Sequence, residues 1–135
     1  MIKPKRKPFA SWKSNTILIV DDAPLMRTML QDVIKTNGLA KETFEAVDGN
    51  DAIKKYLVHK PNLVIMDVIM PNTDGIESLQ QIKKTDPKAK VLMISSVDEK
   101  TKVQDAMKLG AIDYIVKPID RSSLALVINR ALRRN

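Results

Sequence analysis

The segment Thr16-Ile17-Leu18-Ile19-Val20-Asp21-Asp22 decides the predicted fold, because an unbroken apolar run ends abruptly in two acids. Such a run, without polar alternation, is typical of a strand buried on both faces of a parallel sheet. Three later runs share the pattern: Asn62–Met66 ends in Asp67, Val91–Ile94 ends in Ser95-Ser96, and Tyr114–Val116 ends in Lys117-Pro118. These runs predict parallel strands with polar residues at their carboxyl ends.

Helical patterns alternate with these strands and with a weaker strand predicted over Lys41–Val47. Pro24 and Gly38 mark the start and end of the first helix, on whose apolar side we place Leu25. We place Leu57 on the apolar side of the second helix. Strict alternation of five strands and five helices predicts an α/β fold, a doubly wound (βα)5 sandwich around a five-stranded parallel sheet.

The distribution of charge along the sequence distinguishes an N-terminal arm from one folded domain. The net charge is +7, and residues 1–15 hold five bases and no acid, whereas the remainder holds 18 bases and 16 acids. We therefore expect a basic flexible arm over residues 1–15 and a folded domain over residues 16–135. Contact with nucleic acid is not expected, except weakly through this arm.

Composition excludes several classes of protein. The chain has no cysteine, which rules out disulfides and thiolate metal sites. No apolar run approaches the roughly 20 residues that a membrane-spanning helix needs. The basic N-terminus lacks the apolar segment of a signal peptide, so we expect a cytoplasmic protein.

The polar residues after the strands predict a site. In parallel α/β sheets ligands bind beyond the carboxyl ends of the strands, so Asp21, Asp22, Asp67, Ser95 and Lys117 should converge there. Three crowded carboxylates repel one another unless a cation or a lysine compensates, and their oxygens suit magnesium. Two alternatives are that Asp21 and Asp22 cap the following helix and that Lys117 is an ordinary exposed lysine.

From Thr16 to Arg134 the chain resembles the receiver domain of two-component response regulators, and most closely the stand-alone chemotaxis receivers of the CheY type. The resemblance rests on four ordered motifs: Ile17–Asp22, Val64–Pro71 with Asp74-Gly75, Ile94–Ser96, and Gly110-Ala111 with Asp113–Pro118. It implies the flavodoxin-like strand order 2-1-3-4-5. It also implies a phosphorylation-dependent switch of a phosphorelay rather than an enzyme, although the protein would catalyse its own phosphorylation and dephosphorylation.

The resemblance implies a role for each site residue. Asp67 would be the phosphoacceptor, taking a phosphoryl group from a sensor histidine kinase or a histidine phosphotransfer protein. Mg²⁺, or Mn²⁺ in its place, would be bound by Asp22, Asp67 and the backbone carbonyl of Ile69, with Asp21 acting through a water. Ser95 and Lys117 would bind the phosphoryl group. Asp67 and Lys117 would be the catalytic residues of the phosphoryl transfer.

Tyr114 would be the aromatic switch residue. The output partner would bind the helix after Ser95, the strand with Tyr114 and the last helix. We expect a monomer or a weak phosphorylation-dependent dimer. The chain ends at Asn135, just after that helix, which predicts a stand-alone receiver; the receiver half of a longer regulator is the alternative.

One enzyme alternative is disfavoured by a single position. Phosphohydrolases of the haloacid-dehalogenase type carry a second aspartate two residues after the nucleophile, where this chain has Ile69. A flavodoxin-like cofactor site is also disfavoured, because Asp21 and Asp22 would repel a phosphate. Ile69 and Val97 are apolar where receivers of the CheY type are often polar, which predicts slow self-dephosphorylation.

Overall fold

A computed structural model describes residues 15–70, 74–96 and 100–134. The flexible arm expected over residues 1–15 lies outside these residues, apart from Asn15, as does Val97. Within the described ranges no helix combines the length and the apolar character needed to cross a membrane.

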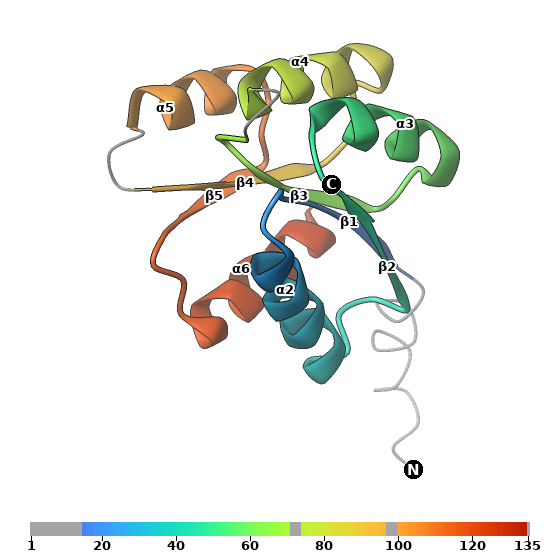
Figure 1. Cartoon of the computed structure of the whole chain (residues 1–135), viewed down its shortest axis with the longest axis vertical. Helices are drawn as coiled ribbons and strands as arrows, with labels where there is room; N and C mark the ends of the chain where they lie inside the picture. Colours follow the sequence, from blue (N-terminus) through green and yellow to red (C-terminus); the bar gives the residue numbers. More distant parts are fainter. Residues whose placement is uncertain (1–14, 71–73, 97–99, 135) are drawn as a thin grey trace.

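Five parallel strands form one sheet in the order β2-β1-β3-β4-β5, which confirms the predicted fold class (Figure 1). The strands are β1 (Thr16–Val20), β2 (Glu42–Ala46), β3 (Leu63–Asp67), β4 (Val91–Ser95) and β5 (Asp113–Val116). Val20 pairs with Met66 and Asp67 pairs with Ile94, so the carboxyl ends of the central strands lie level. This register sets the residues that follow each strand along one edge.

Helices cover both faces of the sheet. They are α2 (Pro24–Thr36), α3 (Gly49–His59), α4 (Gly75–Thr85), α5 (Lys100–Lys108) and α6 (Arg121–Arg133). α3, α4 and α5 lie on one face, and α2 and α6 lie on the other (Figure 1). Three of the helices have an aspartate as their N-cap: Asp48 in α3, Asp74 in α4 and Asp120 in α6. Each aspartate side chain accepts a hydrogen bond from a main-chain N–H of the first turn.

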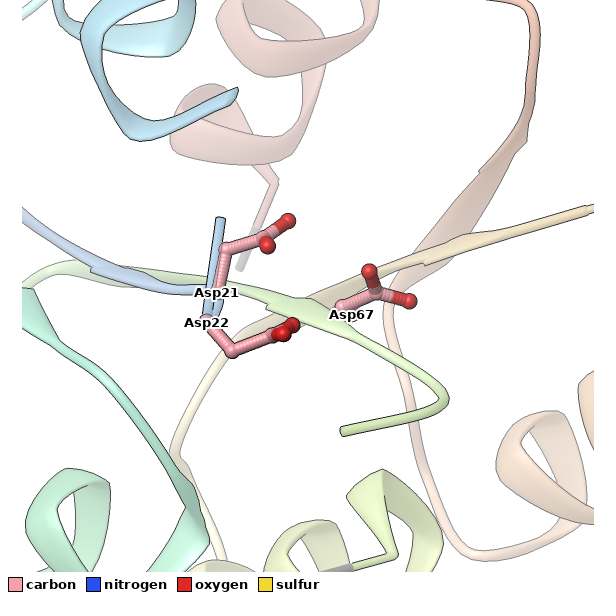
Figure 2. A group of neighbouring side chains, drawn as sticks. All are labelled: Asp21, Asp22 and Asp67. Carbon is pink, nitrogen blue, oxygen red and sulfur yellow. The ribbon is translucent and has the colours of Figure 1, made fainter. Parts of the chain in front are cut away.

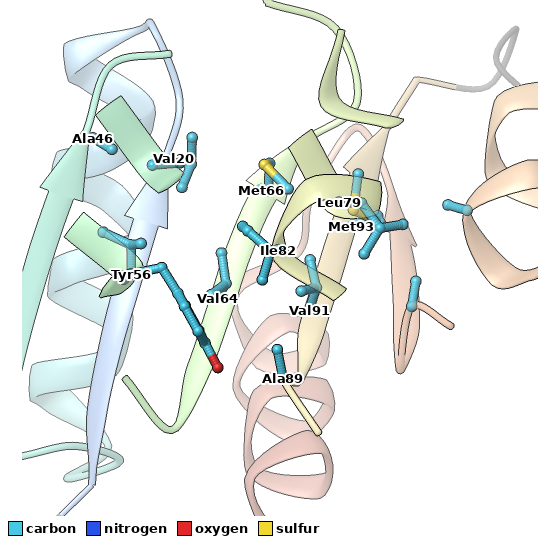
Figure 3. Packing of buried hydrophobic residues seen from close by; sticks show 14 of the residues in the cluster. Val20, Ala46, Tyr56, Val64, Met66, Leu79, Ile82, Ala89, Val91 and Met93 are labelled. Carbon is cyan, nitrogen blue, oxygen red and sulfur yellow. The ribbon is translucent and has the colours of Figure 1, made fainter. Parts of the chain in front are cut away.

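The alternating side chains of each strand build two apolar cores. Leu18 and Val20 pack into the core beneath α3 and α4, part of which Figure 3 shows, and Ile17 and Ile19 pack against α2 and α6. All four side chains are at most 1% exposed, and burying an aliphatic side chain contributes roughly 1.5–3 kcal/mol. Burial on both faces explains why the strands read as continuous apolar runs.

Two apolar residues are not where the sequence placed them. Leu25 is 83% exposed and Leu57 is 48% exposed. α2 instead buries Leu30, Val33 and Ile34. Leu25 lies five positions before Leu30, an offset that puts those two side chains on different sides of the helix. Leu57 directly follows the buried Tyr56, so it is turned about 100° away from the core.

Candidate functional site

Three carboxylates meet at the carboxyl edge of the sheet. Asp21 and Asp22 follow β1, and Asp67 ends the neighbouring β3, so the group sits where the order of the strands reverses. Each contributes a carboxylate oxygen, and these oxygens lie within 4.8 Å of one another. Figure 2 shows the three side chains projecting from the ends of the two strands. Asp21 and Asp67 are buried, whereas Asp22 is exposed.

Asp21 has one satisfied and one unsatisfied carboxylate oxygen. Its Oδ1 accepts a hydrogen bond from the Ala23 N–H at 2.9 Å, and its buried Oδ2 has no hydrogen-bond partner among the described residues. Burial raises the pKa of Asp21, and the charges of Asp67 and Asp22 raise it further, against lowering by the Ala23 N–H and Lys117. The folded protein thus disfavours the ionised form of Asp21, and a bound cation would offset that cost.

Lys117 lies beside the phosphoacceptor predicted from the sequence. Its Nζ is 3.0 Å from Oδ2 of Asp67, across 50 residues of chain, because β5 brings it to the same edge. The other oxygen of Asp67, Oδ1, accepts a hydrogen bond from the Ile69 N–H at 3.2 Å. The interpretation of Lys117 as an ordinary exposed lysine is therefore wrong.

The chain after β3 folds back tightly on the end of that strand. The Gly75 N–H donates to the carbonyl of Val68 at 2.8 Å. A Cβ placed on Gly75 would lie 2.3 Å from the carbonyl oxygen of Asp67, a separation that no side chain tolerates. Glycine at this position lets α4 start directly beside the end of β3.

Ser95 is buried at the end of β4, next to β3. Its side chain is 0% exposed, and its Oγ has no hydrogen-bond partner within the part of the chain that the structure describes. Ser95 also lines a cavity of about 320 Å³ together with Tyr114, whose side chain is 42% exposed on β5. The remaining lining residues come mainly from α5 and β5: Ser96, Lys100, Val103, Gln104 and Val116. The cavity thus lies between the end of β4, which carries Ser95, and the exposed residues of α5 and β5.

The structure brings together most of the predicted site. Asp21, Asp22, Asp67 and Lys117 form one cluster, Ser95 lies on the adjacent strand end, and Tyr114 lies outward from it across the cavity. The interpretation of the two aspartates as caps of α2 is wrong, because Ala23 holds the N-cap position and makes no side-chain cap among the described residues.

Sequence reasoning missed Arg27 and Glu45. Arg27 Nη1 donates to the main-chain carbonyl of Asp21 at 2.7 Å, and its Nε donates to Oε1 of Glu45 at 2.7 Å. An arginine near the helix start, where acids are favoured, was the only signal in the sequence. Glu45 in β2 gave no signal, because only the paired strands bring it close to the turn.

Comparison with known proteins gives consistent matches. The family model for the response regulator receiver domain matches residues 17–129. The chemotaxis protein CheY of Bacillus subtilis is 42% identical over 119 residues, which cover 88% of this chain and 98% of that protein. CheY of Thermotoga maritima is 41% identical over 114 residues, covering 84% and 94%.

A solved structure matches over nearly the whole chain. A chain of the CheX–CheY–BeF3–Mg²⁺ complex from Borrelia burgdorferi superposes with a TM-score of 0.83 at 31% identity. The match covers 98% of this chain and 99% of that one.

Proposed function

The chain belongs to the response regulator receiver family, and from this premise we propose that it is a CheY-like switch phosphorylated on Asp67. Residues 16–135 are then the receiver and residues 1–15 its basic arm. One observation carries the proposal: Asp67 is buried at 6% exposure, grouped with two further carboxylates and paired with Lys117 at 3.0 Å. This arrangement offers a nucleophilic oxygen, a cation site and a fixed positive charge in one place.

The residues present fit a magnesium ion. Asp22, Asp67 and the backbone carbonyl of Ile69 would bind it, and Asp21 would act through a water. The buried Oδ2 of Asp21, which has no partner in the described part of the chain, supports this assignment, because a hydrated cation would satisfy it. When bound, the ion neutralises charge on the transferring phosphoryl group. Mn²⁺ accepts the same oxygen ligands and would substitute.

The transfer itself moves one phosphoryl group. A carboxylate oxygen of Asp67 forms a bond to phosphorus while the bond from phosphorus to the donor histidine nitrogen breaks, and the imidazole keeps that electron pair. The donor is a sensor histidine kinase or a histidine phosphotransfer protein. The ammonium of Lys117, already at Oδ2 of Asp67, pairs with an oxygen of the incoming group.

Ser95 and Tyr114 would convert phosphorylation into a change of surface. The Ser95 hydroxyl has no hydrogen-bond partner among the described residues and would donate to a phosphoryl oxygen. Its movement would open space for Tyr114 in the shared cavity. A hydrogen bond to a charged group contributes roughly 1.5–3 kcal/mol, so two such contacts suffice to shift a two-state equilibrium. The output partner would then bind α5, β5 and α6.

The kinase would dock at the rim around the carboxylates. Leu25 and Ile69 are 83% and 51% exposed near this edge, and exposed apolar residues beside a polar centre suit a protein interface. The protein would act in the cytoplasm. It would be a monomer, or a weak dimer that forms on phosphorylation.

Incubation with acetyl phosphate and Mg²⁺ tests the proposal. Intact-mass spectrometry should show one phosphoryl group on the unmodified chain, and none on Asp67→Asn or in excess chelator. Asp86→Asn is the matched control, because Asp86 accepts a hydrogen bond from Tyr56 at 2.7 Å outside the cluster. Equal phosphorylation of Asp67→Asn and Asp86→Asn would refute the assignment.

A further inference from the structure

Arg27 ties the end of β1 to β2 from the first turns of α2. Its Nη1 donates to the Asp21 carbonyl and its Nε to Glu45, both at 2.7 Å, and its side chain is only 15% exposed. Gln31, one turn later, donates to the other oxygen of Glu45 at 2.9 Å. Both oxygens of Glu45 are therefore engaged, which fixes the plane of the carboxylate that orients Arg27.

Arg27 is one of the few groups that hold the turn carrying Asp21 and Asp22. The N-cap residue Ala23 and the first helical residue Pro24 offer no side-chain hydrogen bond to this turn, whose own side-chain contact is that from the Ala23 N–H to Asp21 Oδ1 at 2.9 Å. The Asp21 N–H donates to the Ala46 carbonyl of β2 at 3.1 Å, and the Asp21 carbonyl accepts from Arg27. The main chain of Asp21 is thus held on both sides, and Arg27 supplies one of the two holds.

We infer that Arg27, oriented by Glu45, is a positioning residue for the magnesium carboxylates of Asp21 and Asp22. This inference rests on the proposed function, because it concerns the same cation site. Arg27 would not touch the ion; it would fix the peptide from which both carboxylates extend. Outer partners of metal ligands typically change metal affinity about 10–100-fold when they are substituted.

The direction in which magnesium affinity changes when Arg27 is substituted distinguishes a positioning role from a purely electrostatic one. A guanidinium near a cation site repels the cation, so its removal should strengthen Mg²⁺ binding if only charge matters. Loss of positioning should weaken binding instead. Arg27→Gln therefore gives opposite results under the two explanations.

Calorimetric titration of the full chain with MgCl₂ is the test. We expect Arg27→Gln to bind Mg²⁺ about tenfold more weakly than the unmodified chain. Arg27→Lys keeps the charge but has no planar fork to reach two acceptors, so its affinity should fall between the two. Arg121→Gln is the matched control: it removes an arginine that pairs with Asp32 between α6 and α2, and should leave affinity unchanged.

Urea unfolding without metal checks that each variant folds. Magnesium affinity in Arg27→Gln that equals or exceeds that of the unmodified chain would overturn the inference. Should Arg27→Gln fail to fold, Arg27→Lys decides alone, and unchanged affinity there would overturn it equally. If the unmodified chain binds no magnesium, the proposed function fails first and the inference falls with it.

Discussion

Ile69 stands at the opening of the carboxylate cluster. Its N–H donates to Asp67 Oδ1, and its side chain is 51% exposed. A branched apolar side chain offers no hydrogen bond to a water that would attack an acyl phosphate on Asp67. Phosphorylated protein should therefore lose its phosphoryl group slowly.

Ile69→Asn should shorten the lifetime of phosphorylated protein severalfold, because the amide can hold the attacking water. The measurement is the decay of the phosphorylated mass after acetyl phosphate is removed. Ile69→Val is the matched control and should decay as the unmodified chain does. Slower or unchanged decay in Ile69→Asn would show that this position does not set the lifetime.

The sequence predicted the position of a site residue only where that residue ends or follows a strand. Asp21, Asp67 and Lys117 each follow an apolar run, and parallel strands align their carboxyl ends, so their convergence followed from the sequence. Arg27 could not be found in that way. Its contact with Glu45 depends on side-chain reach across two elements, which no local pattern encodes.

At the C-terminal end of α6, a lysine from another element serves as a cap. Lys90, just before β4, donates to the carbonyls of Ala131, Leu132 and Arg134 at 3.2, 2.9 and 2.8 Å. The last carbonyls of a helix lack partners within the helix, and a cation there also complements the helix dipole. Burial lowers the pKa of Lys90, so the contact holds a partly desolvated charge.

Lys90→Met should lower the free energy of unfolding by about 2 kcal/mol, because it strands part-buried carbonyls while keeping the aliphatic stem. Urea denaturation measures this change, and hydrogen exchange should quicken in the last turn of α6. Lys88→Met, at an exposed lysine in the same loop, should change stability little. Equal losses in the two variants would contradict the capping role.

The helices and strands were predicted well, but the side of each helix that faces the core was predicted less well. All five strands and five helices exist, but β2 covers Glu42–Ala46 rather than Lys41–Val47. The predicted apolar face of α2 was wrong at Leu25, because its spacing to Met29 and Val33 suits a helical stripe although the buried side of the helix is centred on Leu30, Val33 and Ile34. Strand order was predicted through the family resemblance and not through periodicity, which carries no information on pairing.

Across the whole molecule, metal binding at the carboxylate cluster would be linked to folding. Asp21, Asp22 and Asp67 approach one another only in the folded sheet, and burial disfavours the charge on Asp21 there. A ligand that binds only the folded state stabilises it in proportion to the logarithm of its concentration over Kd. Magnesium should therefore raise the stability of the entire chain.

At a Mg²⁺ concentration of 100 times Kd, the free energy of unfolding should rise by about 2.7 kcal/mol. Paired urea titrations with Mg²⁺ and with chelator measure the increment. Asp67→Asn should lose most of it, while Asp86→Asn, altered outside the cluster, should keep it. An equal increment in both variants would place the stabilising ion elsewhere.

The site residues lie at the ends of four strands, so the ribosome synthesises them at different times. Asp67 leaves the ribosome 50 residues before Lys117, and β5 must then pair with β4 before the ammonium reaches the carboxylate. A nascent or truncated chain that ends before β5 therefore carries the proposed phosphoacceptor without the ammonium of Lys117 beside it. If Asp67 is phosphorylated as proposed, an unfinished copy should be a poorer phosphoacceptor than the complete chain, because it lacks the ammonium of Lys117 beside Asp67.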